Sequence, residues 1–239
     1  MTVSLCSVVL ALSALAWATP DRPGHLEPLG RSGTIEPLHE RVGFIPPKEF
    51  LNDYVLQNRP VLMRKALVDS PAIEKWSDAY LTERAKANSE ATVGVEYGKK
   101  ETRLNGTSMP FTEFLSVYNS SDVYMVNGVP PYLEEDMIIP WPLQCEDYKR
   151  SFEDNVMWFS SGGTKSVIHH DGYENLNCLI RGRKRFLFVN RTRYLEVEKK
   201  IIDYENGSYG SVDVEKVDLD KYPVYQGMQF FSADVVPGE

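Results

Sequence analysis

Apolar positions in the first part of the chain follow helical spacing in some stretches and strand spacing in others. Phe50, Tyr54 and Val55 recur on one helix face, and the two prolines just before them suit a helix start. The predicted helices cover 47–55, 72–87 and 109–115, and the predicted strands cover 60–64, 91–97 and 122–126. The proline-rich stretch 129–144 predicts an irregular connection.

From residue 155 onward the pattern changes to short β-prone runs. The predicted strands cover 156–160, 166–170, 176–180, 183–189 and 229–236. Arg181-Gly182 is typical of a tight turn, so the runs on either side of it are expected to form a hairpin. The charged stretch 191–225 is interpreted as a loop-like excursion between strands.

The first 18 residues have the pattern of a secretory signal peptide. They carry no charged side chain, and Ala16-Trp17-Ala18 fits the small-x-small cleavage pattern. The apolar run is short for a membrane span, and the alternatives are an uncleaved anchor or a buried segment. Membrane association is expected only if this segment stays uncleaved. Residues 19–36 are rich in proline, glycine and charge, which predicts a linker.

Composition places the rest of the chain among globular proteins. Of 239 residues, 42% are hydrophobic and 25% are charged. The formal net charge is -8, and nucleic-acid binders usually carry an excess of basic residues. No nucleic-acid partner is therefore expected. The oligomeric state stays open.

The glycosylation sequons and the cysteines also suit a protein of the secretory pathway. Such a protein would be either resident in the endoplasmic reticulum lumen or secreted. Four asparagines stand in N-x-[ST] sequons: Asn105, Asn119, Asn190 and Asn206. Once the signal peptide is removed, Cys145 and Cys178 remain. They form either one disulfide or two buried thiols.

One short segment of the sequence carries the candidate catalytic or metal-binding motif. The chain has no P-loop, no G-x-S-x-G elbow and no C-x-x-C pair. It does have His169-x-Asp171, which puts an imidazole and a carboxylate on one side of the backbone at a strand end. Such a pair is two-thirds of the 2-His-1-carboxylate triad that binds non-haem Fe(II). The alternative is a surface pair at the end of a strand.

The residues around this pair strongly resemble the JmjC (cupin-like) Fe(II)/2-oxoglutarate oxygenases. Ser166, His169 and Asp171 follow the family pattern Ser/Thr-x-x-His-x-Asp. Asn175 and Lys184 stand six and fifteen residues after the histidine, as the family pattern requires. The resemblance covers residues 37–239 and is strongest to the small hydroxylase-like branch.

The resemblance implies a mainly β fold with N-terminal helices (α+β), built on a double-stranded β-helix, or jelly-roll. Residues 37–150 would form its mixed α/β N-terminal part and residues 151–239 its partial barrel core. It also implies Fe(II) and 2-oxoglutarate as cofactor and co-substrate, with iron held by His169, Asp171 and a second histidine.

The resemblance assigns roles to three further residues, and a fourth, Tyr173, is a candidate because it stands just past the ligand turn. Lys184 would anchor the distal carboxylate of 2-oxoglutarate, with Ser166 bonded to the same group and Asn175 lining the pocket. An inward-facing ammonium between aromatic residues needs an anion, which fits this role; the alternative is a surface lysine in a basic run. Tyr173 would contact substrate, or it is only an aromatic residue at the rim.

The family's second histidine normally follows a Pro-Gly-Asp/Glu turn, strand and tryptophan. Here Pro237-Gly238-Glu239 matches that turn and is the last part of the sequence. We therefore expect a C-terminally truncated form whose barrel stays open, with exposed strand edges and weak iron binding.

Three functions follow as hypotheses. The first is a dioxygenase of the secretory pathway that hydroxylates a protein side chain, inactive in this form. The second is a non-catalytic cupin-like binding or scaffold protein of the endoplasmic reticulum. The third is a small-molecule reaction at a cupin-like metal site. Histone demethylation is disfavoured, because a secreted acidic protein does not meet chromatin.

Overall fold

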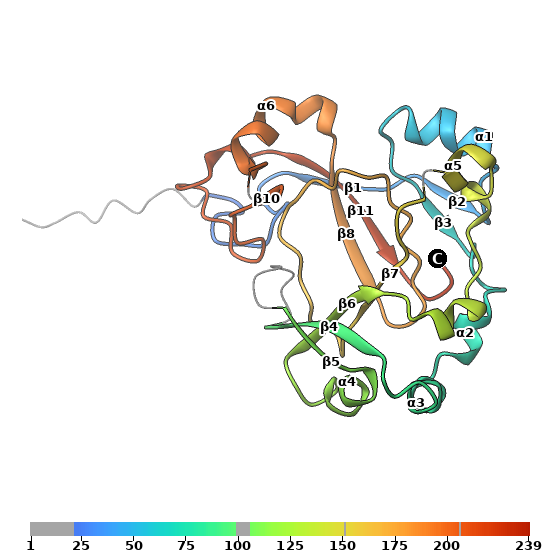
Figure 1. Ribbon diagram of the computed structural model, residues 1–239. Helices are drawn as coiled ribbons and strands as arrows, with labels where there is room; N and C mark the ends of the chain where they lie inside the picture. Colours follow the sequence, from blue (N-terminus) through green and yellow to red (C-terminus); the bar gives the residue numbers. More distant parts are fainter. Residues whose placement is uncertain (1–21, 99–105, 151, 206) are drawn as a thin grey trace, which may run out of the picture.

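The computed structural model describes residues 22–98, 106–150, 152–205 and 207–239 (Figure 1). The expected signal peptide and two of the sequon asparagines, Asn105 and Asn206, lie outside these residues. Within the described ranges, no helix has the length and apolar character needed to cross a membrane.

The first part of the chain holds most of the short helices. Its strands are β1 (Thr34–Pro37), β2 (Glu40–Val42), β3 (Leu62–Arg64), β4 (Thr92–Tyr97), β5 (Thr107–Pro110) and β6 (Val123–Gly128). Its helices are α1 (Pro47–Phe50), η1 (Leu51–Val55), α2 (Pro71–Lys75), α3 (Asp78–Lys86), α4 (Phe111–Val117), η2 (Pro131–Asp136), η3 (Trp141–Leu143) and α5 (Glu146–Arg150).

The second part is richer in strands. It contains β7 (Val156–Phe159), β8 (Lys184–Val189), α6 (Arg191–Ile201), β9 (Ile202–Asp203), β10 (Tyr209–Gly210), η4 (Pro223–Tyr225) and β11 (Gln229–Val235).

Two larger sheets organise the molecule. One has the order β1-β11-β8, with β1 parallel and β8 antiparallel to β11, and the other is the antiparallel sheet β5-β4-β6-β7. Two small pairs, β2-β3 and β9-β10, complete the pairing. The strand content and the helical N-terminal part confirm the expected mainly β, cupin-like class. The described strands do not close into a barrel.

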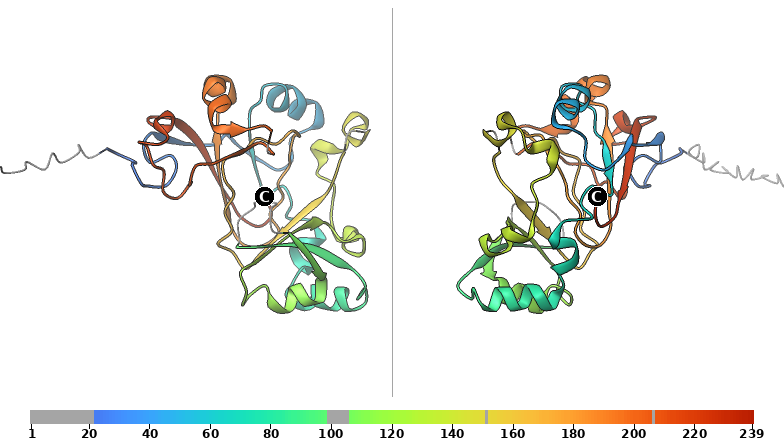
Figure 2. Two further views of the ribbon diagram at one scale, coloured as in Figure 1. Left: turned by 60° about the vertical axis from the view of Figure 1, so that its left-hand side comes forward. Right: turned by 90° about the vertical axis from the view of Figure 1, so that its right-hand side faces the viewer.

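Helices cover the four-stranded sheet on one side. Figures 1 and 2 both place α3 and α4 at one end of the molecule, beyond this sheet. Phe111 and Phe114 of α4 are almost fully buried against Val93 of β4 and Met125 of β6. Each such apolar side chain removed from water contributes about 1.5–3 kcal/mol, so this layer supplies much of the stability.

The local structure confirms most of the predicted elements. The amphipathic stretch 47–55 is helical, with Phe50 and Tyr54 on its buried side. The predicted helix 72–87 is instead two helices, because Trp76 leaves the helical conformation and Ser77 starts α3 as its N-cap. An N-cap serine accepts a backbone N–H that the first turn of the helix cannot otherwise satisfy.

The predicted hairpin around Arg181-Gly182 is wrong. Residues 176–180 form no named strand, and β8 pairs with β11 instead. The backbone of Leu179 is bonded elsewhere: its N–H donates to Glu239 O (2.7 Å), and its carbonyl accepts from Gly238 N (2.9 Å). The predicted strand 166–170 is also absent, apart from a single bridge at His169.

Two segments expected to be irregular are ordered parts of the fold. The stretch 19–36, expected to be a linker, contains paired residues: β1 joins the three-stranded sheet, and Glu27 forms a bridge with Val217. The stretch 191–225 includes an 11-residue helix, α6, whose first turn is capped by the Asn190 side chain.

A buried carboxylate ties the N-terminal helices together. Asp136 has a side chain that is 0% exposed, and it accepts hydrogen bonds from Lys75 Nζ (2.6 Å), Tyr80 Oη (2.6 Å) and Trp76 Nε1 (3.1 Å). Burial works to raise the pKa of Asp136, but the three donors outweigh burial and hold that pKa below its ordinary value. Arg181 Nε donates to the Trp76 carbonyl (3.1 Å), which links this cluster to the turn before β8.

Candidate metal and co-substrate site

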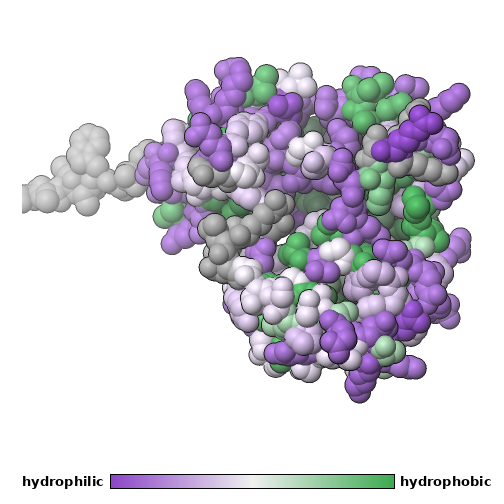
Figure 3. Space-filling model, viewed as in Figure 1, coloured by the Kyte–Doolittle hydropathy of each residue, from purple (hydrophilic) through white to green (hydrophobic). Residues whose placement is uncertain are grey.

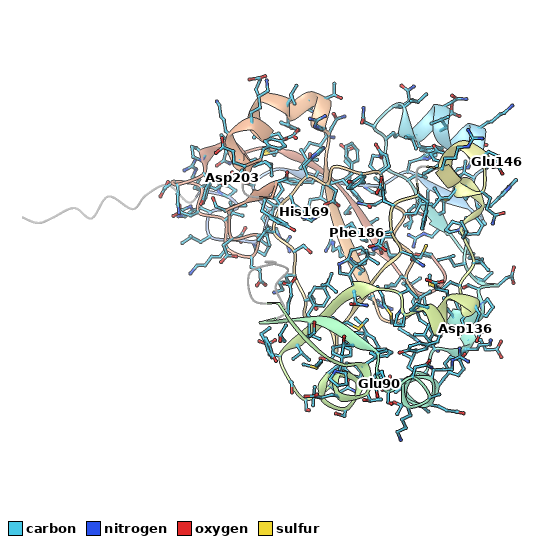
Figure 4. All side chains as sticks on the ribbon, viewed as in Figure 1. Glu90, Asp136, Glu146, His169, Phe186 and Asp203 are labelled. Atoms are coloured by element: carbon cyan, nitrogen blue, oxygen red, sulfur yellow. The ribbon has the colours of Figure 1, made fainter. Side chains whose placement is uncertain are left out.

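His169 lies in an extended segment that runs beside the β9–β10 hairpin. His170 N donates to Ser208 O (3.1 Å), and Gly210 N donates to Ile168 O (2.7 Å), on either side of the bridge between His169 and Tyr209. Figure 4 shows His169 and Phe186 in the middle of the molecule, while Asp136 lies to one side near α2. Backbone pairing therefore holds the motif in place, while His169 and Asp171 remain exposed to solvent.

The His169 ring presents one nitrogen to a metal. Its Nδ1 lies 2.8 Å from the Val167 carbonyl oxygen, which can only accept, so Nδ1 carries the hydrogen. In the neutral ring Nε2 then keeps its lone pair, and it lies 3.7 Å from Oδ1 of Asp171. An Nδ1–H bond to a backbone carbonyl is the usual device that fixes a metal-binding histidine in the correct tautomer.

Asp171 is oriented by a neighbour in the same loop. Asn175 Nδ2 donates to Asp171 Oδ2 (2.8 Å), which leaves Oδ1 on the side of His169. The resemblance assigned Asn175 to the co-substrate pocket, a role that stays a prediction; the contact found in the structure is with the carboxylate ligand.

The two donor atoms fit a shared metal ion. First-row divalent metals bind imidazole nitrogen and carboxylate oxygen at about 2.1 Å, so two donors of one ion lie within about 4.2 Å of each other. The 3.7 Å separation of His169 Nε2 and Asp171 Oδ1 meets this limit. The side chains are 29% and 46% exposed, which leaves the remaining coordination positions open to other ligands.

A third protein donor is not found beside this pair among the described residues. The group of three potential ligands that these residues do contain is His25, Asp218 and Asp220. His25 Nδ1 accepts from Leu219 N (3.2 Å), so its hydrogen is on Nε2, which faces Asp220 Oδ2 at 3.8 Å. That ring offers the carboxylates a hydrogen and no lone pair.

An arginine side chain already pairs with one carboxylate of this second group. Arg22 pairs with Asp220 (2.8 Å), so the charge of that carboxylate is already matched. The cluster therefore fits a contact that fastens the N-terminal segment better than it fits a metal site. His39 is elsewhere, stacked on Tyr54.

Lys184 lies at the start of β8 with its ammonium against aromatic rings. Nζ is 4.9 Å from the Phe186 ring centroid and 5.5 Å from that of Trp158 on β7. Lys184, Phe186 and Phe188 alternate with exposed residues along the strand and are all partly buried. The lysine thus faces the side of the sheet that the sequence predicted. The middle of the face seen in Figure 3 is hollowed, and hydrophobic residues gather beside the hollow.

The structure gives the positions of the two remaining predicted site residues, Ser166 and Tyr173. Ser166 is exposed and three residues before His169. Tyr173 is 68% exposed in the loop after Asp171, where it is accessible to a large substrate. The roles of both residues stay predictions.

The cysteines and the described sequons are accessible in different degrees. Cys145 and Cys178 are unpaired and partly buried, and burial raises the pKa of the Cys178 thiol to about 11; the choice between a disulfide and two buried thiols stays a prediction. Asn119 and Asn190 are exposed, and the Asn190 side chain accepts from Arg193 N as the cap of α6.

Sequence reasoning missed the hairpin that supports the motif. Tyr209 and Gly210 lie 40 and 41 residues after His169, in a stretch whose many charged residues predict a loop. The signal that could have found them is local: two isoleucines precede a glycine-containing turn, and Tyr209-Gly210 follows it.

Comparison with known proteins gives a consistent result. Residues 47–239 match the family described as cupin-like domain. The chain is 26% identical over 214 residues to lysine-specific demethylase 8 of Xenopus tropicalis, covering 80% of this chain and 45% of that protein. It is 27% identical over 237 residues to the human bifunctional peptidase and (3S)-lysyl hydroxylase JMJD7, covering 81% and 73%. A third relative, tRNA wybutosine-synthesizing protein 5 of Danio rerio, is 21% identical over 224 residues, covering 82% and 65%.

Proposed function

Because the chain belongs to the cupin-like domain family of JmjC-type oxygenases, we propose that its protein is a Fe(II)/2-oxoglutarate-dependent dioxygenase. The observation that carries this proposal is the pairing of His169 Nε2 with Asp171 Oδ1 at 3.7 Å. Each of the two side chains makes a hydrogen bond on its other side, which leaves the facing atom available. The chain spans 45% and 73% of the length of the two relatives named first, so the activity is proposed for the whole protein.

Each site residue has one physical task in this proposal. His169 and Asp171 would hold the iron, and Asn175 keeps the carboxylate turned toward it. Fe(II), bound together with 2-oxoglutarate, would supply the O₂ activation that hydroxylation requires. Lys184 would bind the distal carboxylate of 2-oxoglutarate as a point charge, with Ser166 donating to the same group. The aromatic rings of Phe186 and Trp158 lie beside Lys184 and would shield part of that charge contact from water.

A polypeptide side chain is the substrate class that we propose. Two relatives are named as a lysyl hydroxylase and a lysine-specific demethylase, and both names refer to lysine. A lysyl peptide is therefore the first substrate to test. Tyr173, largely exposed beyond Asp171, would contact it at the rim.

We also propose that the protein enters the secretory pathway and is glycosylated. The support is the signal-peptide pattern of residues 1–18 together with sequons whose described asparagines, Asn119 and Asn190, are exposed. Expression in mammalian cells followed by peptide-N-glycosidase treatment tests this proposal. A mobility shift that disappears when both asparagines are changed to Gln supports it for these two sites, and an unshifted protein contradicts it.

One observation favours a second function, that of a non-catalytic cupin-like binding protein. Among the residues that the structure describes, only two donors meet at His169 and Asp171, one fewer than the three-ligand set. Turnover separates the two functions.

The experiment is formation of succinate from 2-oxoglutarate by the full-length protein with Fe(II), O₂ and a lysyl peptide library. His169→Ala is compared with His170→Ala, its neighbour, whose ring contacts Tyr204 instead of the metal pair. The dioxygenase proposal expects turnover that falls about a hundredfold in the first variant and persists in the second. No succinate from the wild-type protein, or equal rates in both variants, would support the binding protein.

A further inference from the structure

The strand that stands opposite the metal motif comes from a distant part of the sequence. His169 and Tyr209 form an antiparallel bridge flanked by the His170 N–Ser208 O and Gly210 N–Ile168 O hydrogen bonds. In this pattern the bridged residues are a non-hydrogen-bonded pair, in which opposite side chains are closest. The Tyr209 ring accordingly lies against the imidazole, with centroids 5.7 Å apart and planes at 49°.

Gly210 permits this close approach. A Cβ at position 210 would lie 2.4 Å from Ile168 Cγ2, 3.2 Å from Ile168 O and 3.1 Å from Ile201 O. Backbone oxygens on two sides cannot move independently, so any side chain here would push β10 away from the motif. A glycine in a strand often marks such a site of close backbone contact.

The hairpin has its own support, independent of the motif. β9 and β10 pair through Ile202–Gly210 and Asp203–Tyr209, and both Ile202 and Gly210 are buried. Ser208 N donates to Asp203 O (2.8 Å), which closes the turn. The hairpin is thus a fixed surface against which the His169 ring rests.

The two contacts of the His169 ring constrain different motions. The Nδ1 bond to Val167 O comes from the ring's own segment and sets the tautomer. The Tyr209 ring comes from another element and limits rotation of the imidazole about its Cα–Cβ bond. Both are needed to keep Nε2 directed at Asp171.

We propose that Tyr209 and Gly210 are positioning residues of the metal site: the tyrosine ring holds the His169 imidazole in its ligating orientation, and the glycine lets β10 reach it. This inference rests on the proposed function, since it assumes that His169 binds the metal. It assigns a role to the segment 191–225 that goes beyond connecting two strands.

The test is titration of the full-length protein with Co(II), followed by calorimetry and by the visible absorption of the bound ion. Tyr209→Ala should weaken Co(II) binding about tenfold, in line with changes to residues that orient metal ligands. Tyr209→Phe keeps the ring and should bind as the wild type does. Tyr204→Ala is the matched control, because Tyr204 is on the same hairpin but contacts His170.

Gly210→Ala supplies an independent variant. It keeps Tyr209 but separates β10 from Ile168, so it too should weaken Co(II) binding and change the absorption spectrum. The inference is overturned if Tyr209→Ala or Gly210→Ala binds like the wild type, or if Tyr209→Phe or Tyr204→Ala is weakened equally. Wild-type binding no tighter than that of His169→Ala would overturn the proposed function itself, and this inference with it.

Discussion

Nε2 of His169 lies 3.7 Å from Oδ1 of Asp171, and each side chain is turned to that position by a hydrogen bond on its other side. Val167 O accepts from the histidine ring, and Asn175 donates to the carboxylate. Two residues of one loop thus present one nitrogen and one oxygen to the same point, a donor set that suits a first-row divalent metal.

The first prediction concerns the proposed anchor for 2-oxoglutarate. Lys184→Ala should raise the KM for 2-oxoglutarate about 10- to 100-fold, because a charge-assisted hydrogen bond contributes about 1.5–3 kcal/mol. Arg185→Ala is the control, since Arg185 is the next residue on β8, faces the opposite side and has a side chain that is 61% exposed. Equal changes in both variants would mean that Lys184 is only part of a basic run.

The second prediction concerns the buried carboxylate. Asp136→Ala leaves Lys75, Trp76 and Tyr80 without their acceptor, so it should lower the free energy of unfolding by about 3 kcal/mol. Glu135→Ala should change it by less than about 0.5 kcal/mol, because Glu135 is its exposed neighbour. Urea unfolding measures the free energy of unfolding of both variants. Equal losses would show that the hydrogen bonds to Asp136 do not stabilise the protein more than an exposed carboxylate does.

The same carboxylate predicts a pH dependence. The pKa of Asp136 is lowered in the folded protein, so the unfolded chain takes up its proton first as the pH falls. The contribution of Asp136 is therefore fully present above the ordinary carboxyl pKa of about 4 and is lost below it. Unfolding of wild type and Asp136→Asn between pH 6 and pH 3 should show a difference that shrinks toward acid. A constant difference would contradict this assignment.

The fourth prediction concerns the thiol at position 178. With its pKa raised by burial to about 11, Cys178 is almost wholly protonated at pH 8. Iodoacetamide should label it about two orders of magnitude more slowly in the folded protein than in urea, because the thiolate is the reactive form. Mass spectrometry of the peptide that contains Cys178 measures this ratio, and equal rates in the two states would show that the thiol is not buried.

Local patterns gave much of the fold correctly. Strands β4, β6, β7, β8 and β11 and the helical stretch at Phe50 follow apolar spacing, which depends on neighbouring residues alone. The failures involve distant partners. Residues 176–180 form an apolar, β-prone run, yet Leu179 bonds to Gly238 and Glu239, a pairing that no local pattern contains. Likewise, β1 is ordered because β11 lies beside it.

The site divides in the same way. His169, Asp171 and Lys184 could be found because their spacing along the chain is itself the motif. The contact of Asn175 with Asp171 and that of Tyr209 with His169 depend on side-chain orientation and on a hairpin 40 residues away. Sequence spacing reveals which residues can bind a metal, whereas the groups that orient them emerge only from the fold.

The most direct test of metal binding by His169 and Asp171 is to locate the site at which the protein binds a divalent metal. Co(II) titration should be compared in wild type, His169→Ala, Asp171→Ala and His25→Ala, the last changing the other group of potential ligands. If His169 and Asp171 hold the metal, their variants lose tight binding while His25→Ala matches the wild type. Tight binding that survives both of those changes and disappears in His25→Ala would contradict this assignment.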